Sequence, residues 1–252
     1  MLELIYSFYS NNASGLITGL VLLGISLLFY RGFRGWRRAL SALSALLAIL
    51  MSIGGASHLY RSAQIDKRLP PPGEMVDIGG YRLHVLAEGP RGGIPVVWFA
   101  GGHAGGIAVH QLHRRVRDEM RSILVDRPGS GWSDTGPFPR TTRREVDEIL
   151  QALAAAGEKG PFIFAGHSFG GLLAANIAYR HPEETAAVAL LDATPLDVIF
   201  YGADREGLSS FVATSRRRGL MNAFGLYRPV LPSDVSTAGG SASLEDISPM
   251  PV

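Results

Sequence analysis

The sequence contains no cysteine among its 252 residues. Disulfide bonds, thiol catalysis and cysteine-ligated metal sites are therefore excluded. Charged residues are also few, at 18% of the chain, and the formal net charge is only +2. Since no basic stripe with interleaved aromatic residues accompanies this near-neutral charge, we expect no nucleic-acid partner.

Apolar residues make up 46% of the chain and gather near its N-terminus. Two uncharged stretches, from about residue 13 to 30 and from about 39 to 60, each approach the roughly 20 residues that cross a bilayer. Residues 1–60 are therefore predicted to form a transmembrane helical hairpin. A cleaved signal peptide would carry its positive charges before the apolar stretch, and a soluble helical hairpin would show a polar face.

The loop between the two stretches predicts the orientation of the hairpin. It is rich in arginine (Arg31, Arg34, Arg37 and Arg38). Short arginine-rich loops tend to stay in the cytoplasm. We expect a multi-pass protein of a bacterial inner membrane, with the domain after the hairpin on the outer side. Arg61, Lys67 and Arg68 follow the second stretch and act against this orientation.

Residues 61–74 read as a linker, because Pro70 to Pro72 favour an extended, semi-rigid spacer. From residue 75 to 195, apolar runs typical of buried strands alternate with helical patterns. Strands are predicted at 75–89 (a hairpin turning at Gly79-Gly80), 94–100, 122–126, 161–165 and 186–192, and helices at 111–121, 142–156 and 172–181. This alternation predicts an α/β fold with a mostly parallel sheet and helices on both faces. Beyond it, we expect a helix at 211–226 and a disordered tail.

The segment Gly166-His167-Ser168-Phe169-Gly170 matches G-x-S-x-G, between a predicted strand and a predicted helix. In that context a sharp strand-to-helix turn exposes the serine hydroxyl as a nucleophile. The flanking glycines lack the side chains that would collide at such a turn. Ser168 is therefore the predicted nucleophile. The alternative is a glycine-rich turn whose serine caps the helix.

Residues 99–106, FAGGHAGG, follow another predicted strand. Acyl transfer needs backbone N–H donors aimed at the developing oxyanion. We predict these donors at Phe169, directly after the nucleophile, and at Gly102, with Gly101 as the next choice. His103 is expected near the pocket mouth rather than as a base. An ordinary glycine-rich loop is the alternative.

A third motif, DRPGSGWSD at residues 126–134, completes a set that resembles the α/β-hydrolase superfamily. It is similar to the loop after the fourth strand of those enzymes, AGHSFGG to their nucleophile elbow, and LLDATP to the end of their sixth strand. The resemblance covers residues 75–195 and implies an α/β-hydrolase fold. Two helices before such a domain also resemble a group of bacterial membrane-bound α/β hydrolases. Asp126 and Arg127 are expected to hold their loop in place.

The resemblance implies a triad in the chain order Ser, then Asp or Glu, then His. His181 is the one histidine after Ser168, and its helix carries it away from the active face. No catalytic histidine is therefore predicted within the chain. Asp192, at the end of the predicted sixth strand, is the candidate acid. The sequence is expected to stop before the strands that carry the family's histidine, with residues 196–252 as the start of a cap and a tail.

The resemblance implies a serine hydrolase that acts on an ester or amide, esterase- or lipase-like, through a Ser168 acyl-enzyme. An aminopeptidase is the alternative within the superfamily, although such relatives usually have a proline in the oxyanion loop. A non-catalytic pseudoenzyme or fragment is the third possibility. No cofactor or metal is expected, since His110 and His113 have no third ligand at recognisable spacing and read as a solvated helix face. The expected partners are a small substrate and the lipid bilayer, and the oligomeric state is left open.

Overall fold

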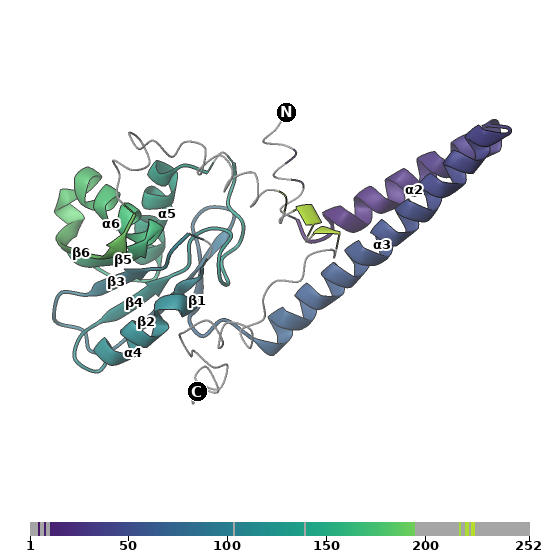
Figure 1. Cartoon of the computed structure of the whole chain (residues 1–252). Helices are drawn as coiled ribbons and strands as arrows, with labels where there is room; N and C mark the ends of the chain where they lie inside the picture. Colours follow the sequence, from purple (N-terminus) through teal and green to yellow (C-terminus); the bar gives the residue numbers. More distant parts are fainter. Residues whose placement is uncertain are drawn as a thin grey trace. The chain divides into compact units, whose positions relative to one another are not determined.

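A computed structural model describes residues 5, 8, 11–102, 104–138, 140–194, 217, 220–221 and 223–224. The chain divides into two compact units (Figure 1). The first comprises residues 1–70 and 205–231, and the second comprises residues 71–204 and 232–252.

The first unit contains a hairpin of two long helices, α2 (Ser14–Gly32) and α3 (Trp36–Arg68). Small residues line the seam between them. A Cβ on Gly19 would lie 2.5 Å from Ser52 Oγ, so the helices approach closely there. The Ser41 hydroxyl donates to the backbone oxygen of Ser26 at 2.5 Å, and the Ser26 and Ser44 hydroxyls lie 2.7 Å apart. Small residues and serine hydrogen bonds of this kind are typical of helix pairs in membranes.

Both helices are long and apolar enough to cross a membrane, judged by length and composition. The most apolar 18-residue stretches within Ser14–Gly32 and Trp36–Ile65 have mean hydropathies of 1.7 and 2.0, and 17% of each stretch is buried. The hairpin predicted for residues 1–60 is therefore present as a pair of helices.

The predicted linker at 61–74 differs from the structure, because α3 continues to Arg68. Residues 61–68 are therefore helical rather than extended. Nothing in this segment breaks a helix before Pro70, and a proline disfavours helical conformation in the residue before it. The prolines from Pro70 onwards, and not the charged residues before them, thus determine where α3 ends.

The second unit is built on a six-stranded sheet of order β1-β2-β4-β3-β5-β6. Its strands are β1 (Glu74–Asp77), β2 (Arg82–Glu88), β3 (Val96–Phe99), β4 (Ser122–Val125), β5 (Phe162–Ser168) and β6 (Thr185–Ala193). Strands β4, β3, β5 and β6 run parallel, while β1 and β2 are antiparallel to their neighbours. The predicted turn at Gly79-Gly80 is confirmed, with φ of 100° and 108°.

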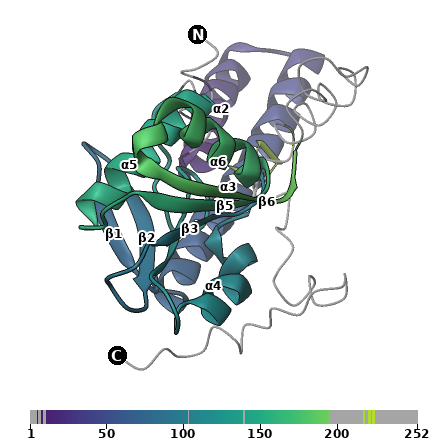
Figure 2. The same cartoon turned by 90° about the vertical axis from the view of Figure 1, so that its left-hand side faces the viewer.

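Helices cover both faces of this sheet, as predicted (Figure 2). The helical elements are the 3-10 turns η1 (Gly106–Val109) and η2 (Pro182–Glu184) and the helices α4 (His110–Val116), α5 (Thr142–Ala155) and α6 (Phe169–Arg180). Alternate residues of β3 enter different cores, because successive strand side chains point to opposite faces. Val97 and Phe99 pack with α5 and α6, whereas Val96 and Trp98 pack on the face that carries η1. Helix α4 is shorter than predicted, and α6 begins at Phe169 rather than at 172.

The predicted cap and tail at 196–252 lie almost entirely outside the described residues. Within them, Arg217, Leu220, Met221 and Ala223 are helical, in the segment where a helix was predicted. Ala223 and Phe224 are buried, and a Cβ on Gly15 would collide with the backbone oxygen of Ala223. This short segment therefore packs against the start of α2 within the first unit.

Candidate functional site

Ser168 lies at the junction between β5 and α6 with φ of 51° and ψ of −121°. A positive φ is uncommon for a residue with a side chain, and such backbone strain clusters at functional sites. The Ser168 side chain makes no capping hydrogen bond to α6. The alternative in which this serine serves as a helix cap is therefore wrong.

Gly166 and Gly170 permit this tight turn because the backbone passes too close for a side chain. A Cβ on Gly166 would lie 2.2 Å from the carbonyl carbon of Gly170. A Cβ on Gly170 would lie 2.4 Å from the backbone oxygen of Phe99, at the end of β3. Both glycines of the motif are thus required by contacts with backbone atoms, which cannot rotate away. His167, between Gly166 and the serine, is exposed.

The glycine-rich loop after β3 passes beside Ser168. A Cβ on Gly101 would lie 3.4 Å from Ser168 Cβ, whereas one on Gly102 would meet nothing within 4 Å. Phe169 is the first residue of α6, where backbone N–H groups lack helical acceptors. The structure therefore brings the loop and the helix start to the nucleophile, and the donor roles of Gly102 and Phe169 remain predictions. His103 lies outside the described residues.

Thr194 is a neighbour of the nucleophile that the sequence analysis missed. Its Oγ1 lies 3.3 Å from Ser168 Oγ, and its backbone N–H donates to the backbone oxygen of Ser168 at 3.1 Å. The sequence did place LLDATP at a strand end. However, only the parallel pairing of β5 and β6 shows that residue 194 reaches the serine.

Asp192, the candidate acid, is exposed and has a φ of 46°. The pairing of β5 with β6 passes from Leu191 to Ala193 and skips Asp192 at an irregularity in register. Among the described residues, no hydrogen bond or ion pair joins Asp192 to Ser168 or to a histidine. Its role as the acid remains a prediction.

The buried His84 and the partly exposed His181 have other partners. His84 Nδ1 lies 2.9 Å from Asp126 Oδ2, and its Nε2 accepts the N–H of Gly73 at 3.1 Å. His181 lies 3.5 Å from Asp147 and 3.4 Å from Glu183, and not at the active face. In the described part of the chain, no histidine is hydrogen-bonded to Ser168.

The expectation of a solvated helix face at His110 and His113 is wrong for His113, which is fully buried. Its Nε2 lies 2.6 Å from Glu88, and its Nδ1 lies 2.9 Å from the Ser122 hydroxyl. The helix was predicted to be solvated because no third ligand accompanies the two histidines, whereas its inner face packs on β4. The described residues contain no group of three or more possible metal ligands.

The loop at 126–134 is held as expected. The Asp126 carboxylate accepts the backbone N–H groups of Gly106 and, at 3.0 Å, Trp132. The Arg127 guanidinium donates from Nη2 to the backbone oxygens of Gly101 at 2.9 Å and Gly102 at 2.5 Å. This single loop is therefore bonded both to the start of η1 and to the glycine-rich loop.

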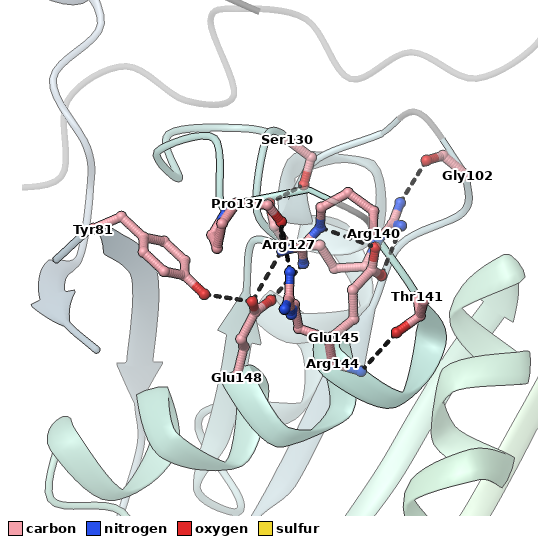
Figure 3. Close-up of polar contacts among 10 residues, drawn as sticks. All are labelled: Tyr81, Gly102, Arg127, Ser130, Pro137, Arg140, Thr141, Arg144, Glu145 and Glu148. Atoms are coloured by element: carbon pink, nitrogen blue, oxygen red, sulfur yellow. Dashed lines mark hydrogen bonds and ion pairs between the residues drawn. The ribbon is translucent and has the colours of Figure 1, made fainter. Parts of the chain in front are cut away.

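A network of charged side chains continues from Arg127 along α5 (Figure 3). Arg127 lies 3.5 Å from Glu145, and Arg140 lies 3.9 Å from Glu145 and pairs with Glu148. Burial raises the pKa of Glu145, although the two arginines oppose that shift. Burial also lowers the pKa of Arg127. Burial and a hydrogen bond to Glu148 raise the pKa of Tyr81 to about 12. The sequence analysis missed this network, because its members are spread over three separate segments.

Residues 95–217 match a family described as alpha/beta hydrolase fold. This part of the chain belongs to the α/β-hydrolase superfamily. An uncharacterized protein of Bacillus subtilis, YbdG, is 26% identical over 196 residues, which are 74% of this chain and 58% of YbdG. Lipase LipV of Mycobacterium tuberculosis is 34% identical over 113 residues, which are 44% of this chain and 41% of LipV.

One solved structure is similar to part of the chain. A crystal structure of an α/β hydrolase from Novosphingobium aromaticivorans is 28% identical, with a TM-score of 0.42, and the match covers 46% of this chain and 41% of that chain. The chain thus spans about half the length of the relatives it matches.

Proposed function

We propose that this protein is a membrane-anchored serine hydrolase that cleaves a carboxylic ester through a Ser168 acyl-enzyme. The observation that carries the proposal is the strained backbone of Ser168, with φ of 51°, at a strand-to-helix turn. A backbone held in this conformation without a structural hydrogen bond to its own helix is expected where the hydroxyl is presented to a substrate.

The proposed reaction has two steps, acylation of Ser168 and hydrolysis of the acyl-enzyme. Ser168 Oγ attacks the ester carbonyl, its proton passes to a base, and the tetrahedral oxyanion is stabilised by backbone N–H donors. The bond from the acyl carbon to the alcohol oxygen breaks, and the alcohol leaves with the proton. Water then attacks the acyl-enzyme, the carboxylic acid leaves, and the serine regains its proton. A serine without a base is a poor nucleophile near neutral pH, so the base decides the rate.

The lipase relative supports an ester substrate, and the absence of proline from FAGGHAGG disfavours an aminopeptidase. A non-catalytic protein is the alternative, and one observation favours it. No histidine in the described residues is hydrogen-bonded to Ser168, whose hydroxyl instead lies beside Thr194.

Labelling with a fluorophosphonate, which phosphonylates activated serines, separates these possibilities. We expect the full chain, extracted in detergent, to be labelled and the Ser168→Ala variant to be silent. Ser130→Ala is the matched control, since that hydroxyl donates to the backbone oxygen of Arg127 and not to Ser168. Absence of labelling in a wild-type chain with a native unfolding transition would establish the non-catalytic alternative.

We further propose that α2 and α3 span the membrane with their connecting loop in the cytoplasm and the sheet unit outside. The windows in both helices are 17% buried, unlike helices in the core of a soluble protein. Because the chain has no cysteine, single cysteines report the topology. An impermeant maleimide should label Gly93→Cys in intact cells and Arg34→Cys only after lysis. The reverse pattern would place the sheet unit in the cytoplasm.

A further inference from the structure

Arg127 is a buried cation whose hydrogen bonds go to the loop beside the nucleophile. Its side chain is 9% exposed, and its Nη2 donates to the backbone oxygens of both Gly101 and Gly102. One guanidinium therefore holds two successive carbonyl groups of a glycine segment. Glycines have the widest choice of backbone conformations. The Gly101 oxygen also accepts the backbone N–H of Ala104 at 3.2 Å, so the guanidinium adds a second restraint there and a further one at the Gly102 oxygen.

The hydrogen bond from Arg127 to the Gly101 oxygen determines the direction of the Gly102 N–H. The peptide unit is planar, and in the trans form its C=O and N–H point in opposite directions. When Arg127 draws the Gly101 oxygen towards itself, the N–H of Gly102 must point away from the guanidinium. Nothing lies within 4 Å of a Cβ on Gly102, so there is open space beside this donor. A cation at the carbonyl end also polarises the peptide and strengthens its N–H as a donor.

Arg127 also contacts the residue that provides the other predicted donor. Its Cζ lies 4.9 Å from the centroid of the Phe169 ring, in a cation–π arrangement. Phe169 begins α6 directly after Ser168. The same guanidinium thus touches both residues expected to supply the oxyanion donors, Gly102 and Phe169.

The burial of Arg127 is not explained by stability. Its acidic neighbour Glu145 lies 3.5 Å away, and the Arg127 Nε is buried without a hydrogen-bond partner among the described residues. Taking a charge out of water is expensive, and an incompletely satisfied buried ion pair is often less stable than apolar side chains of similar volume. An arginine here is better explained by its effect on the loop it holds.

We propose that Arg127 is the positioning residue of the oxyanion site: it orients the Gly101–Gly102 peptide towards the transition state and fixes the Phe169 end of α6 beside it. The inference rests on the proposed hydrolase function. Arg127 touches no substrate atom in this arrangement and acts through the two donors. Its removal should therefore weaken the transition state much more than the binding of substrate.

The test resolves fluorophosphonate labelling of the full chain into the inactivator constant KI and the limiting rate kinact. Removal of an oxyanion donor typically lowers the rate by about 10²–10³-fold. Misorientation of a donor in Arg127→Met should lower kinact by at least about tenfold and change KI by less than about twofold. Arg127→Lys keeps the charge and N–H donors, so it should recover part of kinact.

Arg82→Met is the matched control. Arg82 also binds the 126–134 loop, through Asp134 at 3.1 Å, but its side chain is 56% exposed and contacts Asp134 rather than the glycine segment. We expect wild-type kinact in this variant. A kinact equally reduced in both variants would show a general loosening of the loop and would overturn the proposal. Wild-type kinact in a folded Arg127→Met would overturn it too.

Hydrogen exchange measured by mass spectrometry keeps the inference testable if the wild type is not labelled. Backbone amides of residues 101–106 should exchange at least about tenfold faster in Arg127→Met than in wild type or Arg82→Met. A silent wild type with this acceleration rejects the proposed function and retains the positioning role. A silent wild type without it rejects both.

Discussion

The two units of the protein bury opposite kinds of residue. In the hairpin, Leu28 and Ile53 are 69% and 60% exposed, while Ser26 and Ser41 are 5% and 7% exposed. In the sheet unit, Phe99 and Phe164 are fully buried. Apolar side chains turned outwards and serines turned inwards are expected where the surrounding medium is hydrocarbon. The sheet unit shows the arrangement expected in water. This difference in burial supports the proposal that the hairpin lies in a membrane and the sheet unit lies in water.

A phenylalanine-to-alanine substitution in each unit is expected to give the largest difference in unfolding free energy between them. Phe164→Ala removes a fully buried ring from the sheet core and should lower the unfolding free energy by about 3–5 kcal/mol. Phe29→Ala removes a ring of α2 that is 52% exposed, and should leave the transition of the sheet unit unchanged. Urea unfolding in detergent, followed by tryptophan fluorescence in a Trp36→Phe background so that only Trp98 and Trp132 of the sheet unit report, measures both. Equal losses would show that the two units fold as one.

Glycine-to-alanine changes should have opposite effects in the two units. In Gly170→Ala the new methyl group meets the Phe99 oxygen, and we expect a loss of about 1–3 kcal/mol and disturbed labelling of Ser168. Gly24, within α2, has nothing within 4 Å of its Cβ position. Gly24→Ala should therefore be neutral or stabilise the helix by up to about 1 kcal/mol. Thermal unfolding compares them, and a destabilised Gly24→Ala would reveal a contact on that face.

The buried polar groups of the sheet unit should make its stability depend on pH. The Trp98 indole donates to Ser122 at 2.8 Å, and Ser122 in turn can donate to the neutral His113 Nδ1, whose Nε2–H bonds Glu88. Protonation of His113 would place a second donor against Ser122. Burial also lowers the pKa of His113 from its ordinary value of 6.5. Below pH 6.5, His113 therefore binds a proton in the unfolded chain more readily than in the folded chain.

The unfolding free energy should therefore fall as the pH falls from about 7.5 to about 5.5, by at most about 1.4 kcal/mol per pH unit from this group. Urea unfolding at the two pH values measures the change. In His113→Gln the decrease should be smaller. A decrease of the same size in that variant would assign it to other groups.

The smallest effect is expected at the hairpin seam. Ser26→Ala removes the hydroxyl that lies 2.7 Å from Ser44 Oγ. Hydrogen bonds between membrane helices average about 0.6 kcal/mol, and we expect a loss of that order. Titration with a denaturing detergent, followed by the fluorescence of Trp36 in a background with Trp98 and Trp132 replaced by phenylalanine, gives the value. Leu27→Ala, at a position that is 49% exposed, is the control. A larger loss in the control would place the seam on the other face of α2.

Local features of the chain were enough for a large part of the fold. Apolar runs predicted the strands at 94–100, 122–126, 161–165 and 186–192. A strand buried on both faces must be apolar throughout, and β3 and β4 are buried in this way, whereas most of β6 is exposed. The turn at Gly79-Gly80 followed from the need for positive φ. The end of α3 was misplaced because residues 61–68 are polar but helix-compatible, and polarity alone does not end a helix.

By itself, the sequence determined that a serine would stand at a strained turn, since Gly166, Ser168 and Gly170 are neighbours in the chain and strand and helix flank them. Tertiary structure alone decided that Thr194 reaches the Ser168 hydroxyl, that His113 is buried, and that Arg127 holds Gly101 and Gly102. These contacts join residues 9 to 26 positions apart in the chain, through strand pairing and helix packing. A motif records the local backbone, whereas the partner of a long side chain depends on which segments the sheet brings together.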